Sequence, residues 1–143
     1  MLPTLSVFLI KLPLSTLFSS LTLSTVVFGI HPLGFILGTA LAWHFKLGFI
    51  PARKGGKLPV ETLSTTFVDY SGQSKTLEMR ADAFSPGARV LIADDWIETG
   101  AQVKAVIELV EQQGGKVVGI AAINIDDNPV TALLKAKYNA FAP

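Results

Sequence analysis

The sequence predicts an α/β domain built on a parallel β-sheet, and three features predict it. First, residues 26–30, 90–93 and 116–125 form apolar runs with the length and residue types of buried strands. Second, apolar residues recur at helical spacing in residues 103–110, between the second and third of these runs. Third, a strand, a helix and a strand with this spacing form a right-handed crossover, which places both strands parallel in one sheet.

The elements in the first half of the chain follow from similar patterns. Behind the strand at residues 26–30, the apolar stretch 35–43 predicts a helix. The segment GFIPAR at residues 48–53 predicts a strand that runs into the basic loop KGGK. Residues 61–80 are polar and carry a turn signal at residues 70–73, so we expect two short strands joined by a turn.

The segment VLIADDWIETGAQV at residues 90–103 carries the strongest chemical signal. Its strand is expected to stop at Asp94 and Asp95, after which Thr99 and Gly100 open the next helix. Free backbone N–H groups and the dipole at a helix N-terminus favour an anion, and Thr99 adds a hydroxyl donor. Adjacent carboxylates can accept hydrogen bonds from sugar hydroxyls. The pattern therefore indicates a ligand in which a phosphate lies beside a ribose.

Two further predictions concern packing. Asn128 is expected to cap a last helix that has Pro129 at its first position and Leu133 and Leu134 on its inner face. Trp96 is expected to be a core aromatic, with stacking near a sugar or base as the alternative.

Composition limits the class of protein. The chain has 143 residues, half of them hydrophobic, which suits one domain with a single core. Twelve Lys and Arg against eleven Asp and Glu give a net charge of +1, without the basic excess of a nucleic-acid-binding protein. The absence of cysteine excludes disulfides, thiol catalysis and Cys-ligated zinc, and it fits a cytoplasmic protein. Two histidines make a histidine metal cluster unexpected.

Residues 1–25 differ from the rest of the chain, so we separate them from the domain expected at residues 26–143. They are apolar, carry one charge at Lys11 and show no sustained period. Packing on the domain is the preferred interpretation. A secretory signal is disfavoured because Lys11 lies inside the apolar run, and a membrane anchor at residues 12–30 is disfavoured by its many Ser and Thr.

Residues 90–103 resemble the phosphoribosyl-pyrophosphate (PRPP) signature of type I phosphoribosyltransferases. The wider similarity covers roughly residues 26–125 and is greatest to adenine phosphoribosyltransferases. It includes GFILG at residues 34–38, GFIPARKGGKLP at residues 48–59 and TLEM at residues 76–79. The resemblance implies the three-layer, parallel-sheet type I phosphoribosyltransferase fold, with a flexible hairpin loop over the site.

The same resemblance implies an enzyme. It would transfer the 5-phosphoribosyl group of PRPP to a purine base, adenine in the first instance, giving a nucleoside monophosphate and pyrophosphate. Mg²⁺ would be carried by PRPP, with Asp94 as a candidate contact and no other direct protein ligand. Expected partners are therefore PRPP and a purine, without nucleic acid or membrane, and a homodimer is implied because family members often dimerise.

The resemblance also assigns residues to four roles. Catalysis would involve Asp69 and Tyr70, on the closing loop, and the ribose hydroxyls would be held by Asp94 and Asp95. The 5′-phosphate would be held by Glu98, Thr99, Gly100, Ala101 and Gln102, and the pyrophosphate by Arg53, Lys54, Lys57, His31 and Pro32.

Several positions keep alternatives open. Leu33 stands where the family has an arginine, and Glu98 puts a negative charge beside the expected phosphate. These departures motivate an alternative function, a non-catalytic PRPP- or nucleotide-binding regulatory module of the same fold. From spacing alone, KGGK also fits a solvated basic loop, Asp69 and Tyr70 an exposed hairpin tip, and His31 a loop histidine without a ligand.

Overall fold

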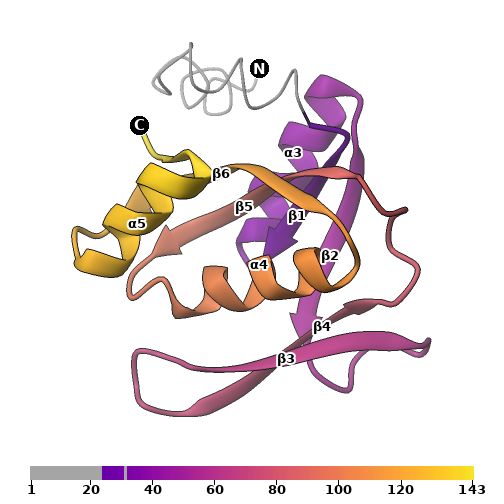
Figure 1. Ribbon diagram of the computed structural model, residues 1–143, viewed down its shortest axis with the longest axis horizontal. Helices are drawn as coiled ribbons and strands as arrows, with labels where there is room; N and C mark the ends of the chain where they lie inside the picture. The colour runs from indigo at the N-terminus through magenta and orange to yellow at the C-terminus, as the bar shows by residue number, and fades with distance from the viewer. Residues whose placement is uncertain (1–23, 31) are drawn as a thin grey trace.

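The computed structural model describes residues 24–30 and 32–143, which form a seven-stranded sheet with strand order β3-β4-β2-β1-β5-β6-β7 (Figure 1). The strands are β1 (Val26–Ile30), β2 (Gly48–Lys54), β3 (Thr62–Val68), β4 (Ser74–Arg80), β5 (Arg89–Ile97), β6 (Lys116–Ile125) and β7 (Ala140–Phe141). The helices are α3 (Gly34–Phe45), α4 (Ala101–Gln112) and α5 (Pro129–Tyr138).

Most of the sheet is parallel, as predicted. β1 pairs in parallel with both β2 and β5, β5 with β6, and β6 with β7. β4 runs antiparallel to both β2 and β3, so the hairpin extends one edge of the sheet. The boundary expected after residue 25 stays a prediction, because residues 1–23 lie outside the described part.

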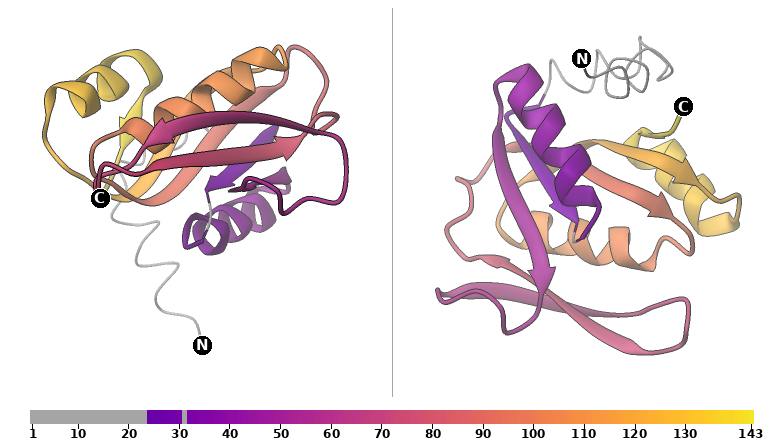
Figure 2. Two further views of the ribbon diagram at one scale, coloured as in Figure 1. Left: turned by 90° about the horizontal axis from the view of Figure 1, so that it is seen from below. Right: turned by 180° about the vertical axis from the view of Figure 1, so that it is seen from behind.

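The domain has three layers, with α3 on one face of the sheet and α4 on the other (Figure 2). Alternation along β1 divides the core, since successive side chains of a strand point to opposite faces. Val27 packs with Leu37 and Leu41 of α3, whereas Phe28 joins the larger cluster that contains Val106 of α4. β1 is therefore buried and contributes side chains to the hydrophobic cluster on each face of the sheet.

Small residues let α3 lie close to the sheet. A Cβ at Gly34 would come within 2.7 Å of the carbonyl oxygen of Ala93, and one at Gly38 within 2.9 Å of the Phe49 ring. A Cβ at Gly29 of β1 would likewise meet that ring, at 2.6 Å. The start of α3 is thus held against the part of β5 that precedes the acidic pair.

The β3–β4 hairpin folds over α4 (Figure 2). Leu63 and Phe67 of β3 pack against the larger core cluster, and the Thr65 hydroxyl donates a hydrogen bond to Glu108 Oε2 of α4 at 3.0 Å. Both predicted strands and the turn between them are therefore present. The packing holds β3 near both of its ends, and the turn that follows reaches the start of α4.

Two expectations about local structure are wrong. β5 does not end at the acidic pair but continues to Ile97, because β6 supplies ladder partners as far as Ile125. Of the two leucines expected on the inner face of α5, only Leu134 faces inward, with 3% of its surface exposed, whereas Leu133 is 68% exposed. The cap predicted for this helix is confirmed, with Asn128 at the N-cap and Pro129 in the first turn.

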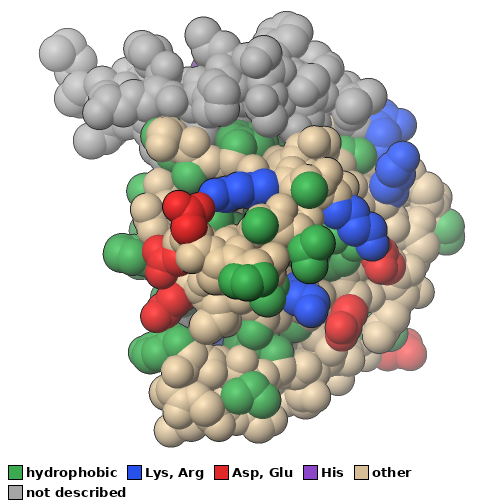
Figure 3. Space-filling model, turned by 60° about the vertical axis from the view of Figure 1, so that its left-hand side comes forward, with side chains coloured by type: hydrophobic (Ala, Val, Ile, Leu, Met, Phe, Trp, Pro, Cys, Tyr) green, Lys and Arg blue, Asp and Glu red, His purple; other side chains and the backbone are tan. Residues whose placement is uncertain are grey.

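The surface is mixed in character. On the face drawn in Figure 3, Lys and Arg side chains are interspersed with Asp and Glu among hydrophobic ones. Within residues 24–30 and 32–143, no helix has the length and hydropathy needed to cross a membrane.

Candidate functional site

A pocket of about 210 Å³ lies where β5 ends, between the β5–α4 turn and the tip of the β3–β4 hairpin. Parallel sheets bind ligands at the carboxyl ends of their strands, and the pocket occupies that edge. Its lining combines three of the predicted groups, the hairpin pair, the acidic pair and the phosphate turn. The lining residues are Phe67, Asp69, Tyr70, Asp94, Asp95, Trp96, Ile97, Glu98, Thr99, Gly100, Gln102 and Val103.

Asp94 is the buried acid of this pocket. Only 4% of its surface is exposed, and its Oδ1 accepts a hydrogen bond from the Asp95 backbone N–H at 2.8 Å. Burial raises the pKa of the Asp94 carboxyl to about 8, and the neighbouring Asp95 carboxyl raises it further in the same direction. At neutral pH the unliganded carboxyl is therefore mostly protonated and can donate as well as accept a hydrogen bond.

The turn from β5 into α4 presents backbone donors to the pocket. Gly100 has φ 83°, and a Cβ there would lie 2.7 Å from Val130 Cγ1, so this position needs glycine. The N-cap position of α4 is held by Gly100, which has no side chain to cap the helix. The Thr99 hydroxyl accepts a hydrogen bond from the Ala101 N–H at 3.2 Å, while Gln102 lines the pocket. The other N–H groups of the first turn and the helix dipole together favour an anion.

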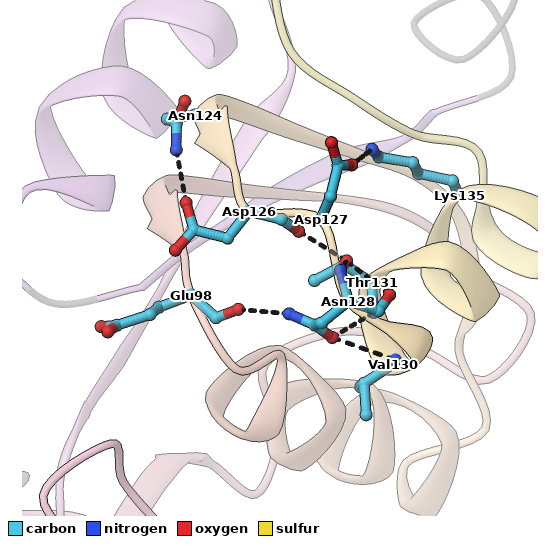
Figure 4. A network of polar contacts seen from close by, with 8 residues as sticks. All are labelled: Glu98, Asn124, Asp126, Asp127, Asn128, Val130, Thr131 and Lys135. Atoms are coloured by element: carbon cyan, nitrogen blue, oxygen red, sulfur yellow. Dashed lines mark hydrogen bonds and ion pairs between the residues drawn. The ribbon is translucent and has the colours of Figure 1, made fainter.

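The same turn is fixed from behind by the start of α5 (Figure 4). The Asn128 side-chain amide donates to the Glu98 carbonyl oxygen at 2.8 Å. Its Oδ1 accepts from the N–H groups of Val130 and Thr131, both at 3.0 Å, which caps α5. One asparagine therefore links the cap of α5 to the proposed phosphate turn.

Trp96 does not have the core position expected of it. It is 58% exposed, lines the pocket, and donates through Nε1 to Asp126 Oδ1 at 3.0 Å. Asn124 donates to the same oxygen at 2.9 Å (Figure 4). The adjacent Ile97, which is 1% exposed, takes the buried place instead. The alternative role, contact with a sugar or base, fits this position better.

Asp69 organises the hairpin tip. Its Oδ1 accepts from the Ser71 N–H, the Ser71 hydroxyl and the Gln73 N–H, at 2.9, 2.6 and 3.1 Å. Its Oδ2 is 2.6 Å from Lys75 Nζ. The bond from Lys75, followed by that from the Ser71 hydroxyl, holds the pKa of Asp69 far below its usual range. Tyr70, 75% exposed, stands next to it over the pocket.

The predicted pyrophosphate residues lie at the same edge of the sheet but not in this pocket. Arg53 and Lys54 end β2, which is two strands away from β5, or roughly 10 Å at ~4.8 Å per strand. Lys57 follows in the adjoining loop, and Pro32 is exposed between β1 and α3. His31 lies outside the described residues. The arrangement suits an elongated ligand with anionic groups at both ends.

Glu78 of β4 is a residue that the sequence analysis did not single out. Its carboxylate, 4% exposed, accepts hydrogen bonds from the backbone of the KGGK loop. The sequence feature that could have pointed to Glu78 is the segment TLEM, in which an acidic residue stands between Leu77 and Met79. These two neighbours are buried, with 2% and 0% of their surface exposed.

Few side chains at the pocket could hold a metal ion. Among the described residues, no three His, Asp or Glu side chains cluster as metal ligands. Mg²⁺ bound to a phosphorylated substrate requires only one or two carboxylates, since phosphates and water complete its octahedron. Asp94, the candidate contact, lines the pocket and would offer one such carboxylate once it has lost its proton.

Comparisons with known sequences give one family. The model described as "Phosphoribosyl transferase domain" matches residues 15–141. The adenine phosphoribosyltransferase of Acidobacterium capsulatum is 43% identical over 102 residues, 71% of this chain and 56% of the relative. That of a Synechococcus species is 52% identical over 95 residues, 66% of this chain and 54% of the relative. The chain thus spans about half the length of the curated relatives it matches.

Solved structures match most of the chain. Adenine phosphoribosyltransferase from Thermoanaerobacter pseudethanolicus superposes with a TM-score of 0.78 at 33% identity, covering 90% of this chain and 75% of that one. The Saccharomyces cerevisiae enzyme, complexed with an imino-altritol bisphosphate and adenine, gives 0.75 at 32% identity, covering 83% and 66%. These superpositions confirm the fold that the sequence resemblance implied.

Proposed function

Because the chain belongs to the phosphoribosyl transferase domain family, we propose that it transfers the 5-phosphoribosyl group of PRPP to adenine, giving AMP and pyrophosphate. One observation carries the proposal. The pocket at the end of β5 joins the acidic pair to the N-terminus of α4, and these are the groups needed for a ribose beside a phosphate. Adenine phosphoribosyltransferases are among its relatives, which favours adenine as the base. The same relatives favour an enzyme over a regulatory module.

Binding divides among three parts of the sheet edge. Asp94 and Asp95 hold the ribose hydroxyls, and the turn from Glu98 to Gln102 holds the 5′-phosphate through backbone N–H groups. Lys54 and Lys57, with Arg53 and Pro32, bind the pyrophosphate. The same role is proposed for His31 from the sequence resemblance alone. The spacing between β2 and β5 supports this division, because it separates the two anionic groups along the edge.

The reaction is a displacement at the anomeric carbon. The bond from that carbon to pyrophosphate oxygen breaks, a bond to an adenine ring nitrogen forms, and the proton of that nitrogen is released. Mg²⁺ carried by PRPP supplies charge neutralisation on the leaving group. The chain contributes by holding the two substrates in line and by placing Lys54 and Lys57 near the departing pyrophosphate.

The hairpin tip has two tasks in this proposal. Closing over the pocket excludes water, which would otherwise capture the ribosyl cation that develops. Asp69, beside Tyr70, accepts or relays the proton lost by adenine. For that step the contact between Asp69 and Lys75 has to open, since an ion-paired carboxylate is a weak base.

The test is pyrophosphate release by the purified full-length chain with PRPP and magnesium. Adenine, guanine, hypoxanthine, xanthine and uracil are supplied separately. We expect release with adenine alone. Release with another base instead would correct the substrate, and calorimetric PRPP binding without release for any base would favour the regulatory alternative.

Two further properties belong to the proposal. A homodimer is supported by large apolar side chains exposed on α3, among them Ile36 and Trp43, and sedimentation equilibrium would test it. A cytoplasmic location is supported by the absence of cysteine and would be tested by cell fractionation.

A further inference from the structure

The buried carboxylate of Glu78 is bonded almost entirely to one loop. Its Oε2 accepts from the Gly56 N–H at 2.9 Å, and its Oε1 accepts from the N–H groups of Lys57 and Leu58, both at 2.7 Å. Three consecutive peptide N–H groups therefore converge on one side chain. Strand alternation directs Glu78 away from the face that carries Leu77 and Met79, and toward this loop.

The loop backbone is shaped to make those bonds. Gly56 has φ 77°, a conformation that L side chains rarely adopt, and a Cβ at Gly55 would lie 2.9 Å from Thr76 Cγ2. The Gly55 N–H also donates to the Thr76 carbonyl oxygen at 2.9 Å. Two glycines thus bring the loop onto β4, where the carboxylate meets its N–H groups.

The carboxylate stays ionised in this position. Burial by itself raises the pKa of Glu78, but the bonds from Gly56, Leu58 and Lys57, with the charge of Arg53, outweigh it and leave the pKa below its usual value. Consecutive N–H groups of this kind would otherwise form a binding site for an external anion. Here the protein supplies the anion itself.

The side chains of the loop remain available. Lys54 and Lys57 are both exposed, and within the described part of the chain neither forms an ion pair. We propose that Glu78 is a positioning residue for the reaction: by binding the N–H groups of residues 56–58 it fixes the loop so that Lys54 and Lys57, and not the loop backbone, bind the pyrophosphate group of PRPP. This inference rests on the proposed function, because it concerns the same substrate.

The test compares ligands that do and do not contain pyrophosphate. Glu78→Gln keeps the size of the side chain but replaces one acceptor oxygen with a donor. Glu61→Gln makes the same change at an exposed position before β3 and serves as the matched control. Calorimetry measures the binding of magnesium pyrophosphate, PRPP and AMP to the wild type and to each variant, and steady-state kinetics gives KM for PRPP and for adenine.

We expect Glu78→Gln to weaken pyrophosphate and PRPP binding about tenfold, the equivalent of one charge-assisted hydrogen bond. AMP binding and KM for adenine should stay within about twofold of the wild type, which corresponds to ~0.4 kcal/mol. Amide exchange at Gly56, Lys57 and Leu58 should become faster. Equal weakening of AMP and PRPP would indicate general damage and would overturn the inference, as would unchanged pyrophosphate binding.

A second variant tests the same inference if Glu78→Gln folds poorly. Gly56→Ala leaves the carboxylate in place but strains the loop at a site where a Cβ meets nothing within 4 Å. It should show the same selective loss for pyrophosphate and PRPP, and an unselective loss would overturn the inference. The two proposals are separable, because a wild type that binds PRPP and pyrophosphate without turnover contradicts the transferase function but leaves Glu78 testable by binding. A wild type without pyrophosphate affinity overturns the role of Glu78.

Discussion

Asp94 and Asp95 have the same side chain, but β5 gives them different surroundings. Asp94 is 4% exposed, whereas Asp95 is only partly buried at the pocket. Burial therefore raises the pKa of Asp94 to about 8, with Asp95 adding to the effect. In the proposed function the two acids would then take different parts in binding the ribose, one as a donor and one as an acceptor.

The raised pKa makes the stability of the unliganded protein depend on pH. The neutral Asp94 carboxyl is the form that the fold favours, so its contribution is complete below pH 4 and is lost as pH rises through about 8. Between pH 5 and 7 the free energy of unfolding should fall by up to about 1.4 kcal/mol per pH unit from this group. Urea denaturation should show the slope in the wild type and in Glu61→Gln, but not in Asp94→Asn. A slope unchanged in Asp94→Asn would contradict the assignment.

At the scale of elements, close packing of α3 determines where the acidic pair stands. Gly34 lies against Ala93 and Asp94, so Gly34→Ala has to move either the helix or the strand. We expect it to lower the free energy of unfolding by about 1–3 kcal/mol and to weaken PRPP binding. Thr39→Ala, on the exposed side of α3, is the matched control and should change neither. Full stability of Gly34→Ala in denaturant titrations would refute this packing.

Asn128 has two roles, because it caps α5 and also supports the turn between β5 and α4. Two variants separate these roles. Asn128→Asp keeps the oxygen that caps α5 but loses the donor to the Glu98 carbonyl, whereas Asn128→Ala loses both. We expect Asn128→Ala to cost about 1 kcal/mol of stability and Asn128→Asp much less. Both should raise KM for PRPP, because the phosphate turn loses its support. Equal stability losses in thermal denaturation, or an unchanged KM, would argue against this division.

At the scale of the whole molecule, much of the fold was predictable because its signals are local. The apolar runs of β1 and β6, the helical spacing in α4 and the cap residue Asn128 each lie within one element. Each needs no knowledge of distant residues. The parallel order of β5 and β6 followed from the length of the connection between them.

The rest depended on partners far along the chain. The continuation of β5 past Asp94 needs the ladder with β6, and the exposure of Trp96 needs Asp126 to bind its Nε1. Glu78 acquires its role only when β4 pairs with β2 and meets the basic loop. Propensity and periodicity carry none of this information. The sequence therefore predicted many of the residues that line the pocket, but not which contacts they make with one another.

In the proposed function, the edge of the sheet joins two substrates in one reaction. The most direct test measures AMP and pyrophosphate together, formed by the full-length chain from adenine, PRPP and magnesium. We expect equal amounts of both products, with kcat/KM reduced about 100-fold or more in a folded Asp94→Asn, Asp95→Asn variant. PRPP binding without either product, at any concentration of adenine, would contradict it.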